Sequence, residues 1–144
     1  MSILQASSGS ELTPLVKPPI TREQLRRYAD ASGDYNPIHL DEEAAQRVGL
    51  DGVIAHGMLS MAFLGQFVQQ QINDTSGAYI SELKVRFVDM VRVGDALTCH
   101  GVVMGHKMHE DGSTLVAIEC WEHNQQGEKV TIGEAVVAVP STDS

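Results

Sequence analysis

The sequence predicts a single α+β domain in which an antiparallel sheet packs around one long buried helix. The chain has 144 residues, the length of one domain, and a domain of this size buries about 68–70% of its unfolded surface. The stretch 53–68 is apolar around nearly its whole helical circumference, which is typical of a helix buried on all sides. From Gly77 onward apolar residues alternate with polar ones, which is the period of strands.

The first twenty residues are expected to form a loose N-terminal segment ahead of a domain at 21–140, with a tail at 141–144. Ser and Gly are frequent at the start, and 12–20 contains three prolines, so this part allows at most a short edge strand. The chain does not open with a basic residue followed by an apolar run. We therefore expect no signal peptide and a cytoplasmic protein.

Three helices are predicted before the sheet. The first lies at 22–31, because Thr21 and Gln24 form a capping-box pattern and Gly33 supplies a stop. The second lies at 42–48, with Asp41 as its N-cap and Gly49 at its end. The apolar helix follows at about 57–72 and would be about 24 Å long.

Four strands are predicted after the helices. In the first, Leu83, Val85 and Phe87 fall on one side together with Ser81, and the charged residues fall on the other. Turn residues at 93–95, 110–113 and 124–127 separate the remaining three strands, which we place at 96–104, 114–122 and 130–139. Because the connections are short, we expect an antiparallel meander.

The stretch 32–39 carries the candidate chemistry. Pro37 forces the residue before it out of the helical region, so the segment is a loop. Asp34 and His39 are five positions apart and can converge across this bend as a general acid/base pair for one water. Asn36 would hold the turn or orient a ligand. The alternative is that Asp34 and Asn36 only make turn hydrogen bonds and that His39 caps the next helix.

The amino end of the apolar helix is the second candidate feature. Gly57 has no side chain to block approach, so its N–H could face a pocket with the positive end of the helix dipole behind it. Such an oxyanion-hole donor contributes roughly 2.7–4 kcal/mol to catalysis. His56 and Met58 flank Gly57 and are assigned, with Asn36, to substrate binding. Ser60 either lines the pocket or bonds back within the helix, and we favour the second.

These two stretches together resemble the MaoC-like (R)-specific enoyl-CoA hydratases, and the similarity extends from about 21 to 140. The matching residues are Ser32-Gly33-Asp34-x-Asn36-Pro37-Ile38-His39, then Ala45, then Ile54-Ala55-His56-Gly57-Met58. The resemblance implies a hotdog fold, usually a homodimer, that hydrates trans-2-enoyl thioesters to (R)-3-hydroxyacyl thioesters. It implies that Asp34 and His39 share the catalytic water and that Gly57 N–H holds the thioester oxygen. No cofactor is expected, since coenzyme A is part of the substrate.

Three alternative functions stay open. One is a dehydratase of the same fold that acts on 3-hydroxyacyl groups of acyl carrier protein. Another is a hotdog thioesterase, although in those enzymes the carboxylate generally lies on or near the central helix and 58–72 here contains no Asp or Glu. The third is a non-catalytic module that binds acyl thioesters.

Charge and composition limit the partners. The net charge of −9 disfavours nucleic acid as a partner, and the apolar helix is too short and interrupted to span a membrane. Any attraction for coenzyme A phosphates must be local, from backbone amides or from Lys84, Arg86, Arg92 or Lys107.

The remaining cysteines and histidines are not expected to be functional. The two cysteines, Cys99 and Cys120, are interpreted as small buried hydrophobes. We expect no metal site: His106 and His109 lack further ligands at a suitable spacing, and His100 and His123 are read as structural. The strands at 96–104 and 130–139 are apolar on both faces, which favours a homodimer in which a second copy covers the sheet.

Overall fold

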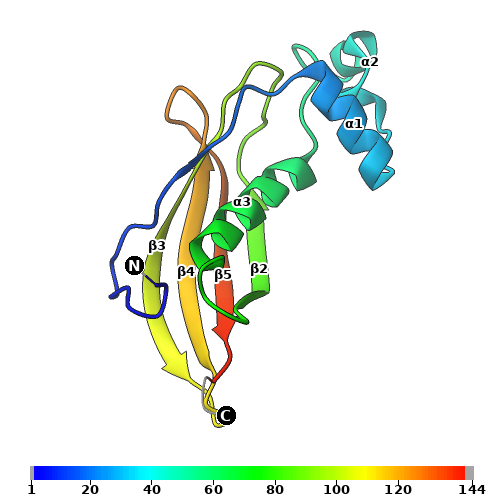
Figure 1. Ribbon diagram of the computed structural model, residues 1–144. Coiled ribbons are helices and arrows are strands. Elements are labelled where there is room, and N and C mark those ends of the chain that lie inside the picture. The colour runs from blue at the N-terminus through cyan, green and yellow to red at the C-terminus, as the bar shows by residue number, and fades with distance from the viewer. Residues whose placement is uncertain (1, 142–144) are drawn as a thin grey trace.

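The computed structural model describes residues 2–141, so most of the predicted tail lies outside the described residues. Figure 1 shows one antiparallel sheet with the long helix α3 lying on one face and two shorter helices beyond its amino end. This confirms the α+β class. The elements are β1 Leu15–Val16, α1 Arg22–Ser32, a 3-10 turn Pro37–His39, α2 Glu42–Arg47, α3 Gly57–Ile72, β2 Tyr79–Phe87, β3 Thr98–Met108, β4 Thr114–His123 and β5 Lys129–Val139.

The helix ends form as their sequences predict. Thr21 Oγ1 accepts a hydrogen bond from Gln24 N at 3.1 Å, and Asp41 Oδ1 accepts from Glu43 N at 2.9 Å. Both bonds satisfy backbone donors that have no partner within the helix. Gly33 ends α1 in the left-handed region at φ 79°, where a residue without Cβ costs least. These caps fix both sides of the loop that carries Asp34 and His39.

The order of strands differs from the predicted meander. The sheet order is β1-β3-β4-β5-β2, so β3, β4 and β5 form a meander but β2 pairs with β5 instead of β3. The register places Phe87 opposite Thr131 and Leu83 opposite Ala135. The sequence pattern places Ser81 on the same side of the strand as Leu83. A bulge between Ile80 and Glu82 interrupts the alternation of sides at that point.

The connection 88–97 explains why β2 and β3 do not pair. It passes the start of α3, where Ala55 N donates to Val91 O at 2.7 Å, and then Ile20 N donates to Asp95 O at 2.9 Å. These bonds carry the chain around the end of the helix to the other edge of the sheet. The strand β2 therefore becomes an edge strand, and residues 88–91 are brought to the amino end of α3.

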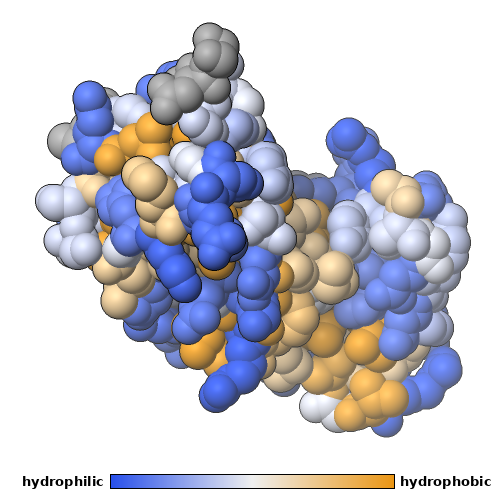
Figure 2. All heavy atoms as spheres, turned by 90° about the horizontal axis from the view of Figure 1, so that it is seen from below, coloured by the Kyte–Doolittle hydropathy of each residue, from blue (hydrophilic) through white to orange (hydrophobic). Residues whose placement is uncertain are grey.

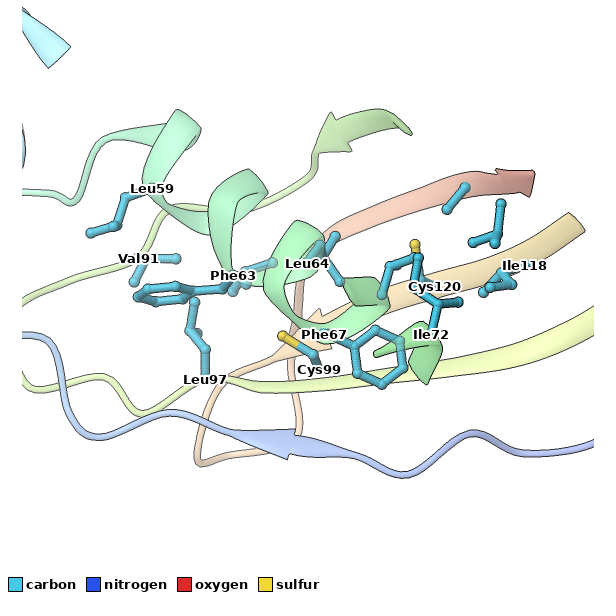
Figure 3. Close-up of a cluster of buried hydrophobic side chains, with 14 of the residues drawn as sticks. Leu59, Phe63, Leu64, Phe67, Ile72, Val91, Leu97, Cys99, Ile118 and Cys120 are labelled. Carbon is cyan, nitrogen blue, oxygen red and sulfur yellow. The ribbon is translucent and has the colours of Figure 1, made fainter. Parts of the chain in front are cut away.

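The core lies between α3 and the inner face of the sheet (Figure 3). One stripe of α3 is buried, and it packs against inward-facing residues such as Cys99, Ile118 and Cys120, with both cysteines free and buried. The approach is close at Gly101, where an added Cβ would lie 2.8 Å from Cε2 of Phe67. The buried helix residues are Leu59, Ser60, Phe63, Leu64, Phe67, Val68 and Ile72.

The prediction that α3 is buried around its whole circumference is wrong for a single chain. Met58 is 55% exposed, and Ala62 and Gln66 on the same side are also exposed. One layer of sheet covers only one side of a helix, so the opposite side stays open. Figure 2 shows apolar patches on the surface of the single chain, and other large exposed apolar side chains include Tyr35, Tyr79, Phe87, Val88 and Met90.

The N-terminal segment, expected to be loose, packs along the outer edge of β3. Gly9 N donates to Val103 O at 2.7 Å and Leu12 N donates to Gly101 O at 2.9 Å. Ile3 is buried, so the segment is anchored by side chains as well as by backbone bonds. Among the described residues, none of the helices combines the length and the apolar character that crossing a bilayer requires.

Candidate active site

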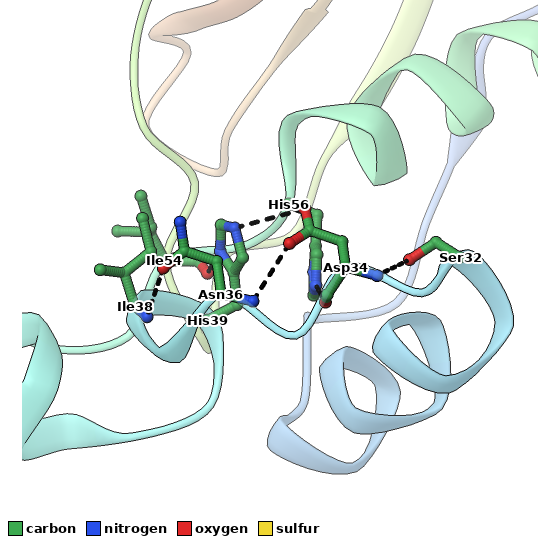
Figure 4. A network of polar contacts seen from close by, with 7 residues as sticks. All are labelled: Ser32, Asp34, Asn36, Ile38, His39, Ile54 and His56. Atoms are coloured by element: carbon green, nitrogen blue, oxygen red, sulfur yellow. Dashed lines mark hydrogen bonds and ion pairs between the residues drawn. The ribbon is translucent and has the colours of Figure 1, made fainter.

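The loop after α1 is held by hydrogen bonds of its own side chains (Figure 4). Asp34 N donates to Ser32 Oγ at 3.2 Å, and Asn36 N donates to Asp34 Oδ1 at 3.1 Å. Asn36 Oδ1 in turn accepts from Ile38 N at 3.3 Å and caps the 3-10 turn. The turn-forming alternative is therefore correct for Asp34 and Asn36, but it occupies only one oxygen of the Asp34 carboxylate.

The second oxygen of Asp34 faces His39. Asp34 Oδ2 lies 3.9 Å from His39 Nε2, with the Asp34 side chain 50% exposed and the His39 side chain 9% exposed. This distance is too long for a direct hydrogen bond and suits a single water that bridges the two groups. The structure thus brings together the carboxylate and imidazole that the sequence paired.

The hydrogen bonds of His39 define its tautomer. Its Nδ1 lies 2.7 Å from the carbonyl oxygen of Ile54, and because a carbonyl can only accept, Nδ1 must carry the proton. In the neutral ring Nε2 then has a free lone pair, and this is the atom that faces Asp34. The alternative that His39 caps the following helix is wrong, since Asp41 caps α2.

His56 connects the loop to the start of α3. Its Nε2 donates to the carbonyl oxygen of Asp34 at 3.1 Å, and its ring stacks on His39 with centroids 4.0 Å apart. Tyr28 contacts its ring edge-on at 4.8 Å. Burial is the main cause that lowers the pKa of His56, which favours the neutral ring beside His39.

The amino end of α3 is open for a ligand. His56 is the N-cap residue but makes no side-chain capping bond, and Leu59 N donates to the His56 carbonyl oxygen at 3.1 Å. The amides of Gly57 and Met58 before it remain available as donors at the positive end of the helix dipole. An added Cβ at Gly57 would lie 3.1 Å from the ring of Phe87. Glycine therefore lets the helix start approach β2 closely.

A cavity of about 180 Å³ lies between His39 and the start of α3, and Asp34 is not one of its lining residues. His39 and Gly57 both line it, with Ser60, Phe87 and Thr131 among the other walls. Ser60 thus lies on the cavity wall, contrary to the within-helix role that the sequence favoured.

The three residues assigned to substrate binding, Asn36, His56 and Met58, are not among those that line this cavity. Met58 is exposed and is not one of the residues that line it. Asn36 is also exposed, and its described hydrogen bonds lie within the turn.

Several cavity walls were missed by sequence reasoning. Phe87 and Thr131 belong to β2 and β5, and Asp89, Met90 and Val91 belong to the connection that follows β2. In the sequence, the only feature that marked these residues was that they lie near the ends of predicted strands. Because the predicted meander kept β2 beside β3, it gave no reason to bring these residues to the start of α3.

Asp34, His39 and His56 could also be considered as metal ligands, since one donor atom of each lies within 4.8 Å of the others. Each ring, however, already commits one nitrogen to a carbonyl oxygen. The two rings are stacked with planes 26° apart, so their remaining in-plane lone pairs run side by side and do not converge on one ion. This geometry fits a water-binding pair better than a tetrahedral metal site.

A larger depression of about 490 Å³ lies on the outer face of the sheet. It is lined by Lys84, Arg86, Trp121 and Lys129 among others. Glu119 and Glu134 lie in the same lining, so its charges are mixed, and His39, which lines the smaller cavity, is not part of it. The smaller cavity at α3 is therefore the candidate active site.

Comparison with known proteins identifies the family of this chain. Residues 5–123 match the family model described as "MaoC like domain". The chain is 30% identical over 122 residues to the (R)-specific enoyl-CoA hydratase of Rhodospirillum rubrum, covering 85% of this chain and 81% of that protein. The solved structure of the (R)-hydratase from A. caviae involved in PHA biosynthesis superimposes with a TM-score of 0.81 at 27% identity, covering 94% of this chain and 98% of that one.

A third relative is much longer. The fatty acid synthase beta subunit hexB of Dothistroma septosporum is 31% identical over 130 residues, which is 90% of this chain but 6% of that protein. The chain therefore spans only a small part of that subunit.

Proposed function

Since this chain belongs to the MaoC-like domain family, we propose that it is an (R)-specific enoyl-CoA hydratase, a hydro-lyase that adds water to trans-2-enoyl-CoA to give (R)-3-hydroxyacyl-CoA. The observation that carries the proposal is that Nε2 of His39 faces Asp34 Oδ2 at 3.9 Å while Nδ1 is bonded to the carbonyl oxygen of Ile54. Two acceptors at this spacing hold one water by both of its hydrogens. The similarity to the Rhodospirillum rubrum hydratase supports the same reaction.

In the proposed mechanism, the water held by Asp34 and His39 attacks C3 of the enoyl thioester. One O–H bond of the water breaks, and its proton passes to the Asp34 and His39 pair. A proton from this pair is delivered to C2 on the same face, which regenerates the pair. Negative charge accumulates on the thioester oxygen in between, and Gly57 N–H at the uncapped end of α3 stabilises it.

The test is hydration of crotonyl-CoA, followed by loss of the conjugated double bond in the ultraviolet. Asp34→Asn and His39→Ala should each lower kcat by about 100-fold or more, as expected for loss of an acid/base group, while circular dichroism shows an unchanged fold. Glu43→Gln, an exposed acid on α2, is the matched control and should retain full activity. Near-normal turnover in either site variant would refute the assignment.

A second candidate is dehydration of (3R)-hydroxyacyl groups on acyl carrier protein. It is supported by the similarity to the fatty acid synthase beta subunit hexB, and the same site would run the reaction in reverse. Comparing crotonyl-CoA with the crotonyl thioester of acyl carrier protein separates the two. A kcat/KM at least tenfold higher on the carrier protein would favour this candidate.

A further inference from the structure

His56 lies behind the reacting groups and touches both of them. Its side chain is 1% exposed, and it is not one of the residues that line the cavity. One face of its ring stacks on His39, and its Nε2 is hydrogen-bonded to the backbone carbonyl oxygen of Asp34 at 3.1 Å (Figure 4). His56 is therefore placed to act on Asp34 and His39 and not on the substrate directly.

The other ring nitrogen of His56 has no partner. Because the Asp34 carbonyl can only accept, Nε2 carries the proton, and Nδ1 of the neutral ring is a bare acceptor. This Nδ1 is buried without a hydrogen bond from any residue that the structure describes. A buried acceptor in this state is costly, and an apolar ring of similar shape would avoid the cost, so the imidazole needs another explanation.

The surroundings hold His56 in its neutral form. The groups that face the ring are Tyr28, His39 and the Asp34 carbonyl. Burial lowers the pKa of His56 most, the bond to the Asp34 carbonyl offsets part of this effect, and the neighbouring His39 lowers the pKa further. A neutral His56 does not compete for the proton that Asp34 and His39 exchange with water.

The bond from His56 links Asp34 to the start of α3. Asp34 lies in an exposed loop, and its other described hydrogen bonds go to Ser32 and Asn36 within that loop. The same imidazole that holds the Asp34 backbone also packs on the His39 ring. One rigid ring thus relates the two groups whose side chains lie 3.9 Å apart.

We infer that His56 is a positioning residue for hydration, whose Nε2–H holds the Asp34 backbone so that Asp34 and His39 keep the spacing that binds one water. The inference rests on the proposed hydratase function and adds a residue to it. Small displacements of a reacting group lower the rate steeply, by about 100-fold for roughly 1 Å. The bond should therefore affect kcat more than KM.

The experiment compares His56→Phe with His56→Gln in the hydration of crotonyl-CoA. Phenylalanine keeps a flat ring against His39 but removes Nε2–H, so kcat should fall by about 10–100-fold with little change in KM, while the protein unfolds near the wild-type temperature. Glutamine has no ring but offers an amide N–H at a similar reach. It should recover at least about tenfold of the lost kcat.

The matched control is His106→Gln. His106 lies on β3, where its Nε2 donates to the carbonyl oxygen of Ile3 at 3.2 Å, and it does not line the cavity. This variant also replaces a carbonyl-bonded imidazole and should keep the wild-type kcat. Nitrogen-15 NMR of the wild type at pH 7 should show His56 protonated at Nε2 and unprotonated at Nδ1.

The inference is overturned if folded His56→Phe keeps the wild-type kcat, or if His56→Gln is as slow as His56→Phe. It is also overturned if Nδ1 of His56 carries the proton at pH 7. Failure of the wild type to hydrate crotonyl-CoA would instead overturn the proposed function. The two failures are therefore distinguishable.

Discussion

At the scale of single residues, Gly57 has two roles that one substitution can test. Its missing side chain lets the helix start lie against Phe87, and its amide lies at the cavity. Gly57→Ala should place a methyl group against the Phe87 ring and displace the amide. We expect kcat to fall by about 10²–10³-fold, as for loss of an oxyanion donor, with a smaller effect on KM.

The control for Gly57→Ala is Gly65→Ala on the same helix, where the added Cβ would be 3.8 Å from its nearest neighbour, Leu83. This is ordinary contact, so activity should be unchanged. Steady-state hydration kinetics of the two variants give the comparison. Equal activity of Gly57→Ala and wild type would remove Gly57 from the site.

Glu122 should make stability depend on pH. Burial raises its pKa from 4.5 to about 8, so between these pH values the folded protein holds a proton that the unfolded chain has released. The free energy of unfolding should therefore fall as pH rises from about 4.5 to 8. Urea unfolding at intervals across this range measures it, and Glu122→Gln should flatten the slope. An unchanged slope in that variant would assign the effect to other groups.

At the scale of elements, the packing of α3 on β3 depends on Gly101. Because a Cβ there would meet the Phe67 ring at 2.8 Å, Gly101→Ala should overpack the core and cost about 1–3 kcal/mol. Thermal unfolding measures this loss. Gly105→Ala on the same strand is the control, since its nearest neighbour would be Ser8 Oγ at 4.0 Å, and it should unfold near the wild-type temperature.

The helices and the turn could be predicted because their signals are local. Thr21, Asp41 and Gly33 act on backbone groups within a few residues, and the bend that brings Asp34 toward His39 lies within one short segment. The position of β2 could not be predicted in the same way. Alternation defines which residues of a strand face inward but not which strand lies beside it.

Some cavity-lining residues were not predicted for the same reason, because the sequence pattern does not show which strands are neighbours. Phe87 and Thr131 are far apart in sequence and meet only because β2 pairs with β5. Ser60 was assigned to the wrong contact because a residue on a helix can bond back to its own backbone or face outward, and its neighbours across the cavity decide between the two. Such contacts depend on tertiary structure.

At the scale of the whole molecule, the open side of α3 supports a homodimer, which we propose for this protein. Exposed Met58 and Tyr79, and the apolar Phe87, Val88 and Met90 beside the site, would be covered by a second copy. Size-exclusion chromatography with light scattering should give about twice the 15.6 kDa of the chain. A mass equal to that of a single chain at micromolar concentration would contradict the proposal.

The N-terminal segment also has a consequence for how copies can join. It runs along β3 from Gly9 to Lys17 and occupies the hydrogen-bonding groups on that border of the sheet, whereas β2 forms the other border. A protein with two free borders can add copies at both and grow into fibrils. The border strand on that side is the two-residue β1, which lies between Pro14 and Pro18, and so short and proline-flanked an edge offers little to pair with. Copies of this protein would therefore join through the nine-residue β2, and joining of two such strands would leave no long edge open.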